Sequence, residues 1–427
     1  MTAEELQKLF GPEIRRLIDV HIEEDPSAFA LKYHGDVTMP VRAVAEQIAC
    51  RRKAAKKLPK LVSNDLLYTT LSLEQASGEK TARFKSALDG MAGKRLLDMT
   101  GGLGIDSIFF AGRFEEVLYV ERDEVLAKVA AHNFRELGIG NIRVISGDSV
   151  ELLEASADDS FDLIYLDPAR REKGKRSVSL EAAQPNVILL HDLLLQKAGK
   201  VCIKASPALE ISSLHETLPS LSRVIVISVA RECKEIVLIC EKDKRQGASR
   251  AVVDAVCLYK NAETVISGRE GSVEKNTVKL GLGKYFYEPD PAIIKARLTD
   301  VLAQKHEMLY INPKVDYLTS DREIVSFPGR RFKVKEFFVY STKIFRRFLN
   351  DARIDAAGIQ RRDFPLSPEE IRRKFSLGES DRLFLFFTRN AFLEPVCICC
   401  EKLWDTHESR GAAVHGRRPW SGLEFSS

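Results

Sequence analysis

Short runs of β-forming residues alternate with helical stretches between residues 95 and 241, and this alternation limits the possible folds more than any other feature. Apolar runs such as Leu163–Leu166 are typical of strands buried on both faces of a sheet. Strands that alternate with helices predict parallel pairing through helical crossovers. The predicted strands are Arg95–Met99, Glu116–Glu121, Ile142–Ser146, Phe161–Leu166, Lys200–Ala205, Arg223–Ala230 and Glu235–Cys240, and the clearest predicted helices are Asp123–Leu137 and Gln184–Lys197.

The last two predicted strands are joined by only a few residues, around Arg231–Lys234. Because a parallel crossover needs a dozen residues or more, this pair is expected to be antiparallel. The prediction is therefore an α/β fold: a Rossmann-like, mainly parallel sheet of seven strands with an antiparallel last strand, over residues 86–245.

The flanking segments differ in pattern from this region. Residues 1–85 show apolar residues at helical spacing and predict an N-terminal helical region. Residues 246–327 and 328–402 mix strands and helices and predict two small α+β domains. Residues 403–427 have no periodicity and are expected to form a disordered tail.

A glycine-rich turn, Asp98–Gly104, follows the first predicted strand. Glycines permit a tight turn and a close approach of the backbone to a ligand, but dinucleotide-binding folds use similar turns. Two residues distinguish a ligand with a methionine moiety from a dinucleotide. The carboxylate of Asp98 suits the cationic amino group of a methionine moiety and would repel a pyrophosphate, and Ser107 stands where the dinucleotide fingerprint requires glycine.

Further acidic residues follow the next two strands. Glu121 can accept hydrogen bonds from ribose hydroxyls, and Asp148 can accept the amino group of adenine. Each acid alone could be a helix cap, but ligands bind at the carboxyl ends of parallel strands. The predicted cofactor is S-adenosyl-L-methionine, bound by Asp98, Thr100, Gly101, Gly102, Gly104, Asp106, Glu121 and Asp148.

The fourth predicted strand runs directly into Asp167-Pro168-Ala169-Arg170-Arg171. This run resembles the Asp-Pro-Pro-aromatic motif of amino methyltransferases. A carboxylate and a backbone carbonyl that accept both N–H groups of an exocyclic amine would position it for in-line methyl transfer. Asp167 and Pro168 are the predicted acceptors and Arg170 could stack on a base, but Ala169 in place of the second proline leaves the acceptor open.

Basic residues cluster beside this motif although the net charge is only +4. Such runs are often solvated faces, yet their position favours a polyanionic substrate. Lys204, at the end of the fifth strand, could contact a phosphate or only extend its amine to solvent. The predicted substrate-binding residues are Arg171, Lys173, Lys175 and Lys204.

Several motifs together resemble the bacterial THUMP-like-domain methyltransferases: the Asp98–Asp106 turn, the segment Leu73–Lys85, Asp167–Arg171, Tyr287–Pro291 and Arg361–Ser367. The resemblance implies a class I methyltransferase domain, a ferredoxin-like domain at 246–327 and a THUMP-like domain at 328–402. It implies structured RNA, ribosomal or transfer RNA, as substrate. It also implies that Gln75, Ser77 and Thr81 close over the cofactor, although the same segment would fit a helix cap.

Two other functions stay open: methylation of a protein or small molecule, and an RNA-binding module that has lost catalysis. No metal is expected, because the spacing of the cysteines and histidines fits no zinc pattern. The eight cysteines, mostly in apolar runs, and the lack of a long apolar segment predict a cytoplasmic protein that does not enter a membrane.

Overall fold

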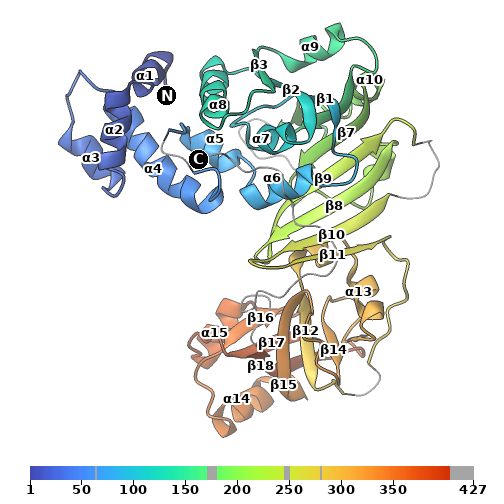
Figure 1. Ribbon diagram of the computed structural model, residues 1–427. Coiled ribbons are helices and arrows are strands. Elements are labelled where there is room, and N and C mark those ends of the chain that lie inside the picture. The colour runs from blue at the N-terminus through green and yellow to red at the C-terminus, as the bar shows by residue number, and fades with distance from the viewer. Residues whose placement is uncertain (63–64, 171–179, 245–250, 279–280, 404–427) are drawn as a thin grey trace. The chain divides into compact units, whose positions relative to one another are not determined.

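The computed structural model describes residues 1–62, 65–170, 180–244, 251–278 and 281–403 (Figure 1). These residues form two compact units. The first contains the described residues up to Ser222 and the second half of strand β9 from Val237; the second contains Arg223–Ile236 and the described residues after 250.

Six helices form the predicted N-terminal helical region: α1 (Ala3–Leu9), α2 (Pro12–Val20), α3 (Pro26–Lys32), α4 (Val41–Lys57), α5 (Thr70–Gln75) and α6 (Glu79–Ser86). Capping residues determine where several of these helices begin. Thr2 and Glu5 form a capping box at α1, and the Asp25 carboxylate accepts the first free N–H groups of α3. Gly11 and Pro12 separate α1 from α2, since proline is favoured at the first helical position and disfavoured later.

The predicted parallel sheet is present in the first unit. Its strands are β1 (Gly93–Asp98), β2 (Phe114–Glu121), β3 (Ile142–Ser146), β4 (Phe161–Leu166) and β7 (Ala198–Ala205), and all their pairings are parallel. The helices that connect them are α7 (Ile105–Ala111), α8 (Glu124–Glu136), α9 (Ser149–Ala155) and α10 (His191–Lys197), and α11 (Leu214–Thr217) follows β7.

Strands β8 (Leu221–Val229) and β9 (Glu232–Glu241) extend this sheet in the order β3-β2-β1-β4-β7-β9-β8, which contains the seven predicted strands. Only Ala230 and Arg231 join them, both with positive φ (49° and 64°), as in the tight turns that match strand twist. A two-residue link permits only an antiparallel hairpin. The predicted α/β class, with a Rossmann-like sheet and an antiparallel last strand, is confirmed.

The helix predicted over Gln184–Lys197 is shorter than expected. Gln184 belongs to a two-residue strand, β6 (Ala183–Gln184), which pairs with β5 (Ala169–Arg170), and helix α10 begins only at His191. Pro185 disfavours a helical conformation at the residue before it. Asn186 then accepts the N–H groups of Ile188 and Leu189 at 3.1 Å each, which forms a turn.

The range predicted as a ferredoxin-like domain contributes strands to two sheets. Strand β10 (Val252–Leu258) pairs in parallel with β8 and antiparallel with β11 (Glu263–Gly268), so the first sheet has nine strands instead of the predicted seven. Strand β12 (Tyr285–Pro289) pairs instead with β15 (Gly329–Val339), which lies in the range predicted as the THUMP-like domain. Strand pairing in the second unit therefore does not follow the boundary predicted at residue 327.

The second unit contains a seven-stranded sheet of order β13-β14-β12-β15-β18-β17-β16. Its remaining strands are β13 (Leu309–Tyr310), β14 (Leu318–Ser320), β16 (Gly358–Arg361), β17 (Leu383–Arg389) and β18 (Pro395–Leu403), and its helices are α12 (Pro291–Lys295), α13 (Thr299–Lys305), α14 (Thr342–Asp351) and α15 (Pro368–Phe375).

Alternation along β17 and β18 divides this sheet into two apolar faces. Leu385, Phe387, Cys397 and Cys399 pack with Phe345 of α14, whereas Phe384, Phe386, Ile398 and Cys400 belong to a separate cluster. Successive side chains of a strand point to opposite faces, so both faces of β17 and β18 are buried. All eight cysteines are free thiols and all but Cys233 are buried, which agrees with their expected role as small apolar residues.

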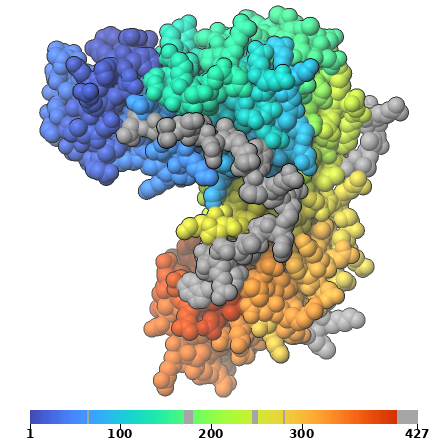
Figure 2. Space-filling view, viewed as in Figure 1, coloured from blue at the N-terminus to red at the C-terminus, as the bar shows by residue number. Residues whose placement is uncertain are grey.

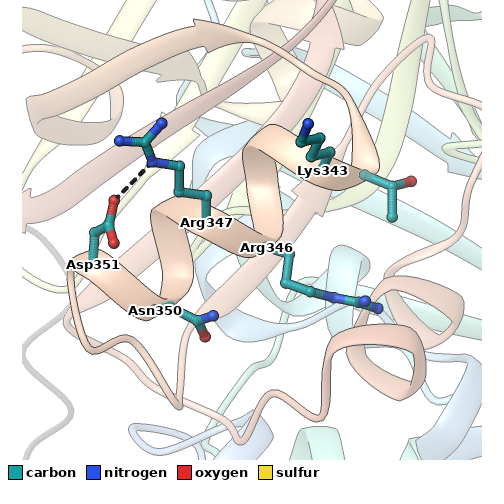
Figure 3. Close-up of a pocket in the computed structure, with 6 residues that line it drawn as sticks. Lys343, Arg346, Arg347, Asn350 and Asp351 are labelled. Carbon is teal, nitrogen blue, oxygen red and sulfur yellow. Dashed lines mark hydrogen bonds and ion pairs between the residues drawn. The ribbon is translucent and has the colours of Figure 1, made fainter.

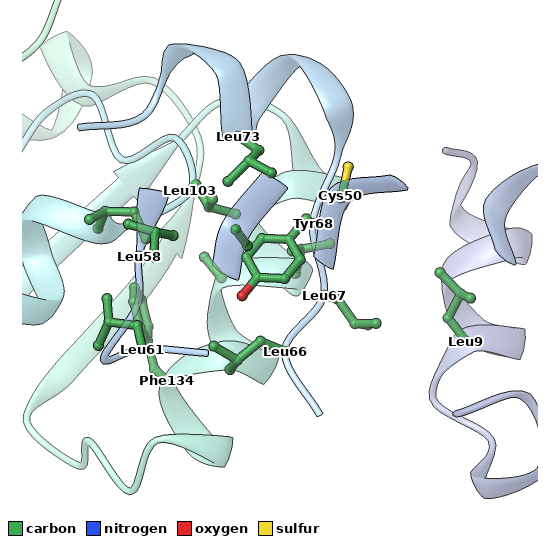
Figure 4. Packing of buried hydrophobic residues seen from close by; sticks show 14 of the residues in the cluster. Leu9, Cys50, Leu58, Leu61, Leu66, Leu67, Tyr68, Leu73, Leu103 and Phe134 are labelled. Atoms are coloured by element: carbon green, nitrogen blue, oxygen red, sulfur yellow. The ribbon is translucent and has the colours of Figure 1, made fainter. Parts of the chain in front are cut away.

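One apolar core joins the N-terminal helices to the side of the parallel sheet covered by α7 and α8 (Figure 4). Within it, Leu66, Leu67 and Tyr68 pack with Leu103 and Phe134. Figure 2 shows the N-terminal region, in blue, directly beside the surface of the sheet region.

Two side-chain amides hold the extended segment at residues 67–68 in this core. The amide of Asn133, on α8, exchanges two hydrogen bonds with the backbone of Leu67, at 2.9 and 2.8 Å. The amide of Gln47, on α4, does the same with the backbone of Tyr68, at 3.0 and 2.6 Å. These pairs satisfy buried backbone groups that have no strand partner, so helices 1–6 are part of the same folded unit as the sheet.

Candidate active site

The predicted site residues lie at the carboxyl ends of neighbouring parallel strands. Asp98 ends β1 and lies opposite Tyr119 of β2 and Tyr165 of β4 in the sheet register. Glu121 ends β2, Asp167 follows β4 and Lys204 lies near the end of β7. Parallel pairing thus brings residues up to 106 positions apart in sequence to one edge of the sheet, where open α/β folds bind ligands.

The glycine turn is closely packed on one side and open on the other. A Cβ atom at Gly101 would lie 2.3 Å from Cζ of Tyr119, whereas one at Gly102 would meet nothing closer than 3.7 Å. Gly102, with a φ of 59°, donates its N–H to Glu121 Oε2 at 2.8 Å and accepts the Tyr119 hydroxyl at 2.5 Å. The turn is therefore held in place by the end of β2 and leaves backbone accessible to a ligand.

Gly104 is required for both its conformation and its size. Its φ is 77°, and an added Cβ would lie 2.5 Å from Cζ of Phe134. We expect Gly104→Ala to lower the free energy of unfolding by about 2–5 kcal/mol, from left-handed strain and overpacking together. Gly138→Ala is the matched control, because Gly138 also has a positive φ but no neighbouring atom within 4 Å. Urea unfolding followed by circular dichroism would measure both; equal losses would exclude the contact with Phe134 as a cause.

Asp98 is an almost fully buried carboxylate. Its Oδ2 accepts the Ser107 hydroxyl at 2.5 Å, and its Oδ1 accepts the Thr100 N–H at 3.0 Å. Burial raises the pKa of Asp98 to about 7, against the lowering effect of these hydrogen bonds. Such a carboxylate gains from a cationic partner, so the position suits a ligand ammonium group.

The acids after β2 and β3 are also bonded within the protein. Glu121 Oε1 accepts the N–H of Asp123 at 2.8 Å. Asp148 caps α9 through Val150 N–H at 2.8 Å and pairs with Arg122 at 2.7 Å. The Val150 hydrogen bond, followed by Arg122, keeps the pKa of Asp148 below its usual range. Asp148 is therefore a helix cap as well as a predicted contact for adenine.

Asp167 is linked to the cofactor turn by its backbone. Its N–H donates to the Thr100 hydroxyl at 2.6 Å, so Thr100 connects the end of β4 to the glycine turn. The Asp167 side chain is 28% exposed, and Pro168 is buried. Lys204, although only 8% exposed, forms an ion pair with Oδ2 of Asp167.

The segment between α5 and α6 contributes a buried residue to the same place. The Ser77 hydroxyl donates to Asp106 Oδ2 at 2.7 Å and accepts the amine of Lys204 at 3.1 Å. Thr81 is buried and donates to the carbonyl of Gly78 at 3.1 Å, and Gln75 is exposed at the end of α5. Ser77 is thus brought together with Asp106, Lys204 and Asp167, while within the described residues neither Thr81 nor Gln75 forms a hydrogen bond or ion pair with them.

Two residues of the site were not predicted from the sequence. Lys85 on α6 is fully buried and pairs with Asp106 at 2.9 Å, and the Tyr165 hydroxyl donates to the same carboxylate at 2.7 Å. Lys85 lies four residues after Thr81 and therefore on the same helix face. This spacing was the one sequence feature that could have indicated Lys85 as a site residue. Nothing in an apolar strand run such as Leu163–Leu166 indicates where the Tyr165 hydroxyl will bond.

Three predicted substrate-binding residues, Arg171, Lys173 and Lys175, lie outside the described residues, as does the side chain of Arg170. Over the described ranges, the structure contains no group of three or more histidine, cysteine, aspartate or glutamate side chains that could hold a metal ion. Within those ranges no helix has the length and apolar character needed to cross a membrane.

The donor set fits the predicted cofactor better than a dinucleotide. Asp98, at the end of β1, suits an ammonium group and would repel a pyrophosphate. Glu121 and Asp148 suit ribose hydroxyls and an adenine amine, which both kinds of cofactor carry. Gly102 leaves room for backbone approach without loss of packing.

Two family models match parts of the chain. A model described as THUMP domain-like matches residues 329–402, and one described as conserved hypothetical protein 95 matches residues 78–216. The second match covers the parallel sheet from the approach to β1 through α11, and the first covers strands β15 to β18 with α14 and α15.

Longer similarities cover most of the chain. An uncharacterized S-adenosylmethionine-dependent methyltransferase of Mycobacterium tuberculosis, found in strains CDC 1551 and H37Rv, is 26% identical over 353 residues, which are 81% of this chain and 92% of that protein. A crystal structure from Porphyromonas gingivalis W83, classed as a methyltransferase, superposes with a TM-score of 0.81 at 26% identity and covers 93% of this chain and 99% of that one. These findings confirm the predicted resemblance to THUMP-like-domain methyltransferases, with S-adenosylmethionine as cofactor.

Proposed function

We propose that this S-adenosylmethionine-dependent methyltransferase transfers the methyl group to an exocyclic amine of a base in structured RNA. The observation that carries the proposal is the hydrogen bond from Asp167 N–H to Thr100. It holds a carboxylate that can accept an amine next to the turn that would hold the cofactor. When bound, S-adenosylmethionine supplies an electrophilic methyl group.

The residues of the chain contribute positioning and electrostatics. Asp98 would accept the ammonium group of the cofactor and Glu121 its ribose hydroxyls. Asp167 and the carbonyl of Pro168 would accept the two N–H groups of the acceptor amine, which directs the lone pair of the nitrogen toward the methyl carbon. The nitrogen–carbon bond forms as the carbon–sulfur bond breaks with its electron pair going to sulfur, and the methylated nitrogen then loses one proton to solvent.

The THUMP-like region offers a surface suited to a nucleic-acid backbone. Helix α14 buries Phe345 and Leu349 and exposes Lys343, Arg346 and Arg347 on its outer side. These cations line a hollow of about 520 Å³ (Figure 3), and one of them, Arg347, is bonded to Asp351 at 3.3 Å. Lys343 and Arg346 are the pair proposed to contact phosphates, since such contacts supply most sequence-independent affinity for nucleic acid.

Replacing Lys343 and Arg346 together by alanine is expected to lower affinity for RNA and to reduce the slope of log Kd against log salt by about 2, one per lost phosphate contact. Fluorescence anisotropy with bulk transfer RNA over a salt series would measure the slope. Lys128→Ala, which removes an exposed lysine on α8, is the control. A double variant with the wild-type slope would exclude α14 from the RNA contact.

Methyl transfer itself tests the proposed substrate. The full-length chain is incubated with S-adenosylmethionine labelled in the methyl group and total RNA from a strain that lacks the gene. We expect label in RNA, with mass spectrometry of the nucleosides identifying a base methylated on an exocyclic nitrogen. Label that enters protein or small molecules of the same strain, but not RNA, would refute the RNA substrate and favour the other acceptors.

A further inference from the structure

A buried polar network connects the N-terminal helices to the candidate acceptor carboxylate. Asp106, at the start of α7, forms an ion pair with the amine of Lys85 at 2.9 Å and accepts hydrogen bonds from the hydroxyls of Ser77 and Tyr165, each at 2.7 Å. Lys85 and Ser77 come from residues before β1, Tyr165 from β4. Charges so deeply buried persist only when they are paired and hydrogen-bonded.

Ser77 lies at the centre of this network. Its hydroxyl donates to Asp106 and accepts from both Lys85, at 2.8 Å, and Lys204, at 3.1 Å. A serine hydroxyl has one donor and two acceptor positions, so all of its hydrogen-bonding capacity is used. Two ammonium groups are therefore held at fixed points around one oxygen.

The network also balances charge. Lys85 and Lys204 offset Asp106 and Asp167, all within a region where Lys85 is fully buried and Lys204 and Asp106 are 8% exposed. Lys85, followed by Lys204, counteracts the effect of burial and keeps the pKa of Asp106 low. Removing one member would leave a buried charge without its partner, so the four charges act as one unit.

We infer that Lys204 is a positioning residue that orients Asp167 for the acceptor, and that Ser77 and Lys85 hold Lys204 in place. The inference deepens the proposed function and rests on it. Lys204 forms its ion pair with Oδ2 of Asp167. Within the described residues, Oδ1 of Asp167 has no hydrogen-bond partner. A carboxylate fixed in this way presents one oxygen to the acceptor amine in a single orientation. Lys204 is then committed to Asp167 rather than to a substrate phosphate.

The kinetic test compares Lys204→Gln with Lys204→Arg in the full-length protein. Lys204→Gln is expected to lower kcat for RNA methylation by about 100-fold, because small misplacements of reacting groups have effects of that size. The KM for RNA and the Kd for S-adenosylmethionine are expected to stay unchanged. Lys204→Arg keeps a cation beside Asp167 and is expected to recover most of the loss. A phosphate contact would instead change KM, and a purely structural role would change cofactor binding as well.

Lys200→Gln is the matched control. Lys200 lies on the same strand, at its other end, and pairs with Glu241 at 3.1 Å. Its removal is expected to leave kcat at the wild-type value. Ser77→Ala is a milder variant that leaves all four charges present; it is expected to lower kcat in the same direction as Lys204→Gln.

An acceptor-independent measurement separates this inference from the proposed function. Lysines are acetylated with an N-hydroxysuccinimide ester and quantified by mass spectrometry, with exposed Lys343 as reference. Lys204 and Lys85 are expected to be protected in the wild type, and Asp167→Asn to release Lys204 but not Lys85. If the wild type methylates no RNA but the lysines are acetylated as expected, the proposed RNA substrate is refuted and the pairing of Lys204 with Asp167 is supported. If Lys204 reacts as fast as Lys343, or if Lys204→Gln keeps wild-type kcat, the positioning role is refuted.

Discussion

Asp167→Asn is expected to reduce kcat for methyl transfer by about 100- to 1000-fold, the range seen when one preorganised electrostatic group is removed from an active site. Asparagine keeps the size of the side chain but removes its charge, and its amide group would face either Lys204 or the acceptor amine with a donor. The Thr100 contact is made by the backbone of residue 167, so the cofactor turn should be unaffected. Quenched-flow measurement of a single turnover would report the chemical step directly.

The matched control is Asp159→Asn, in the turn that precedes the start of the same strand, β4. Asp159 has a φ of 53° and pairs with Lys242, and asparagine tolerates this left-handed conformation. This control should transfer methyl groups at the wild-type rate. If Asp167→Asn also does so, while its affinity for S-adenosylmethionine is unchanged, Asp167 has no part in the reaction.

Asp98→Asn is expected to weaken S-adenosylmethionine binding by about 3 kcal/mol, or roughly 100-fold in Kd, because it removes the buried partner of an ammonium group. Asparagine can still serve Thr100 N–H and the Ser107 hydroxyl, so the turn should keep its shape. Isothermal titration calorimetry measures the change. Asp25→Asn, which preserves the cap of α3 since both residues are good caps, should bind like the wild type.

The same residue predicts a pH dependence. Burial raises the pKa of Asp98 to about 7, so the carboxylate becomes neutral below that pH and loses its attraction for a cation. The affinity of the wild type is therefore expected to fall as the pH is lowered from 7.5 to 5.5, a window in which an α-amino group stays largely protonated. The Asp98→Asn variant should show no such fall; a parallel fall in both proteins would assign the pH effect to another group.

The stability of the cofactor-free wild type should change with pH in the opposite direction to its cofactor affinity, increasing as the pH is lowered. A carboxyl group whose pKa is higher in the folded state favours folding most below its unfolded pKa, near 3.8, and this contribution is lost as the pH rises through about 7. Without cofactor, Asp98→Asn is thus expected to be more stable than the wild type at pH 8, with a smaller difference at pH 5. Thermal unfolding at the two pH values checks this. A residue that destabilises the free protein but binds the cofactor is a common cost of function.

The parallel sheet could be predicted because its signals are local. Ile142–Ser146 and Phe161–Leu166 form strands over the predicted bounds, since an apolar run between turn residues specifies its own extent. The helix predicted from Gln184 was too long, because periodicity alone does not register that Pro185 and Asn186 form a turn. The division of 246–327 between two sheets was also not visible, since strand pairing depends on partners distant in sequence.

The sequence by itself determined which residues lie at the ligand-binding edge: Asp98, Glu121 and Asp167 each follow a strand, and parallel strands end at one edge whatever their order. Only the tertiary structure decided what these acids contact. Lys85 and Ser77 reach Asp106, and Lys204 reaches Asp167, because α6 packs beside α7 and β7 beside β4. Lysine is ordinarily solvated, and a chain pattern cannot show that one is buried. Side chains become buried and charges become paired only when elements distant in sequence pack against one another.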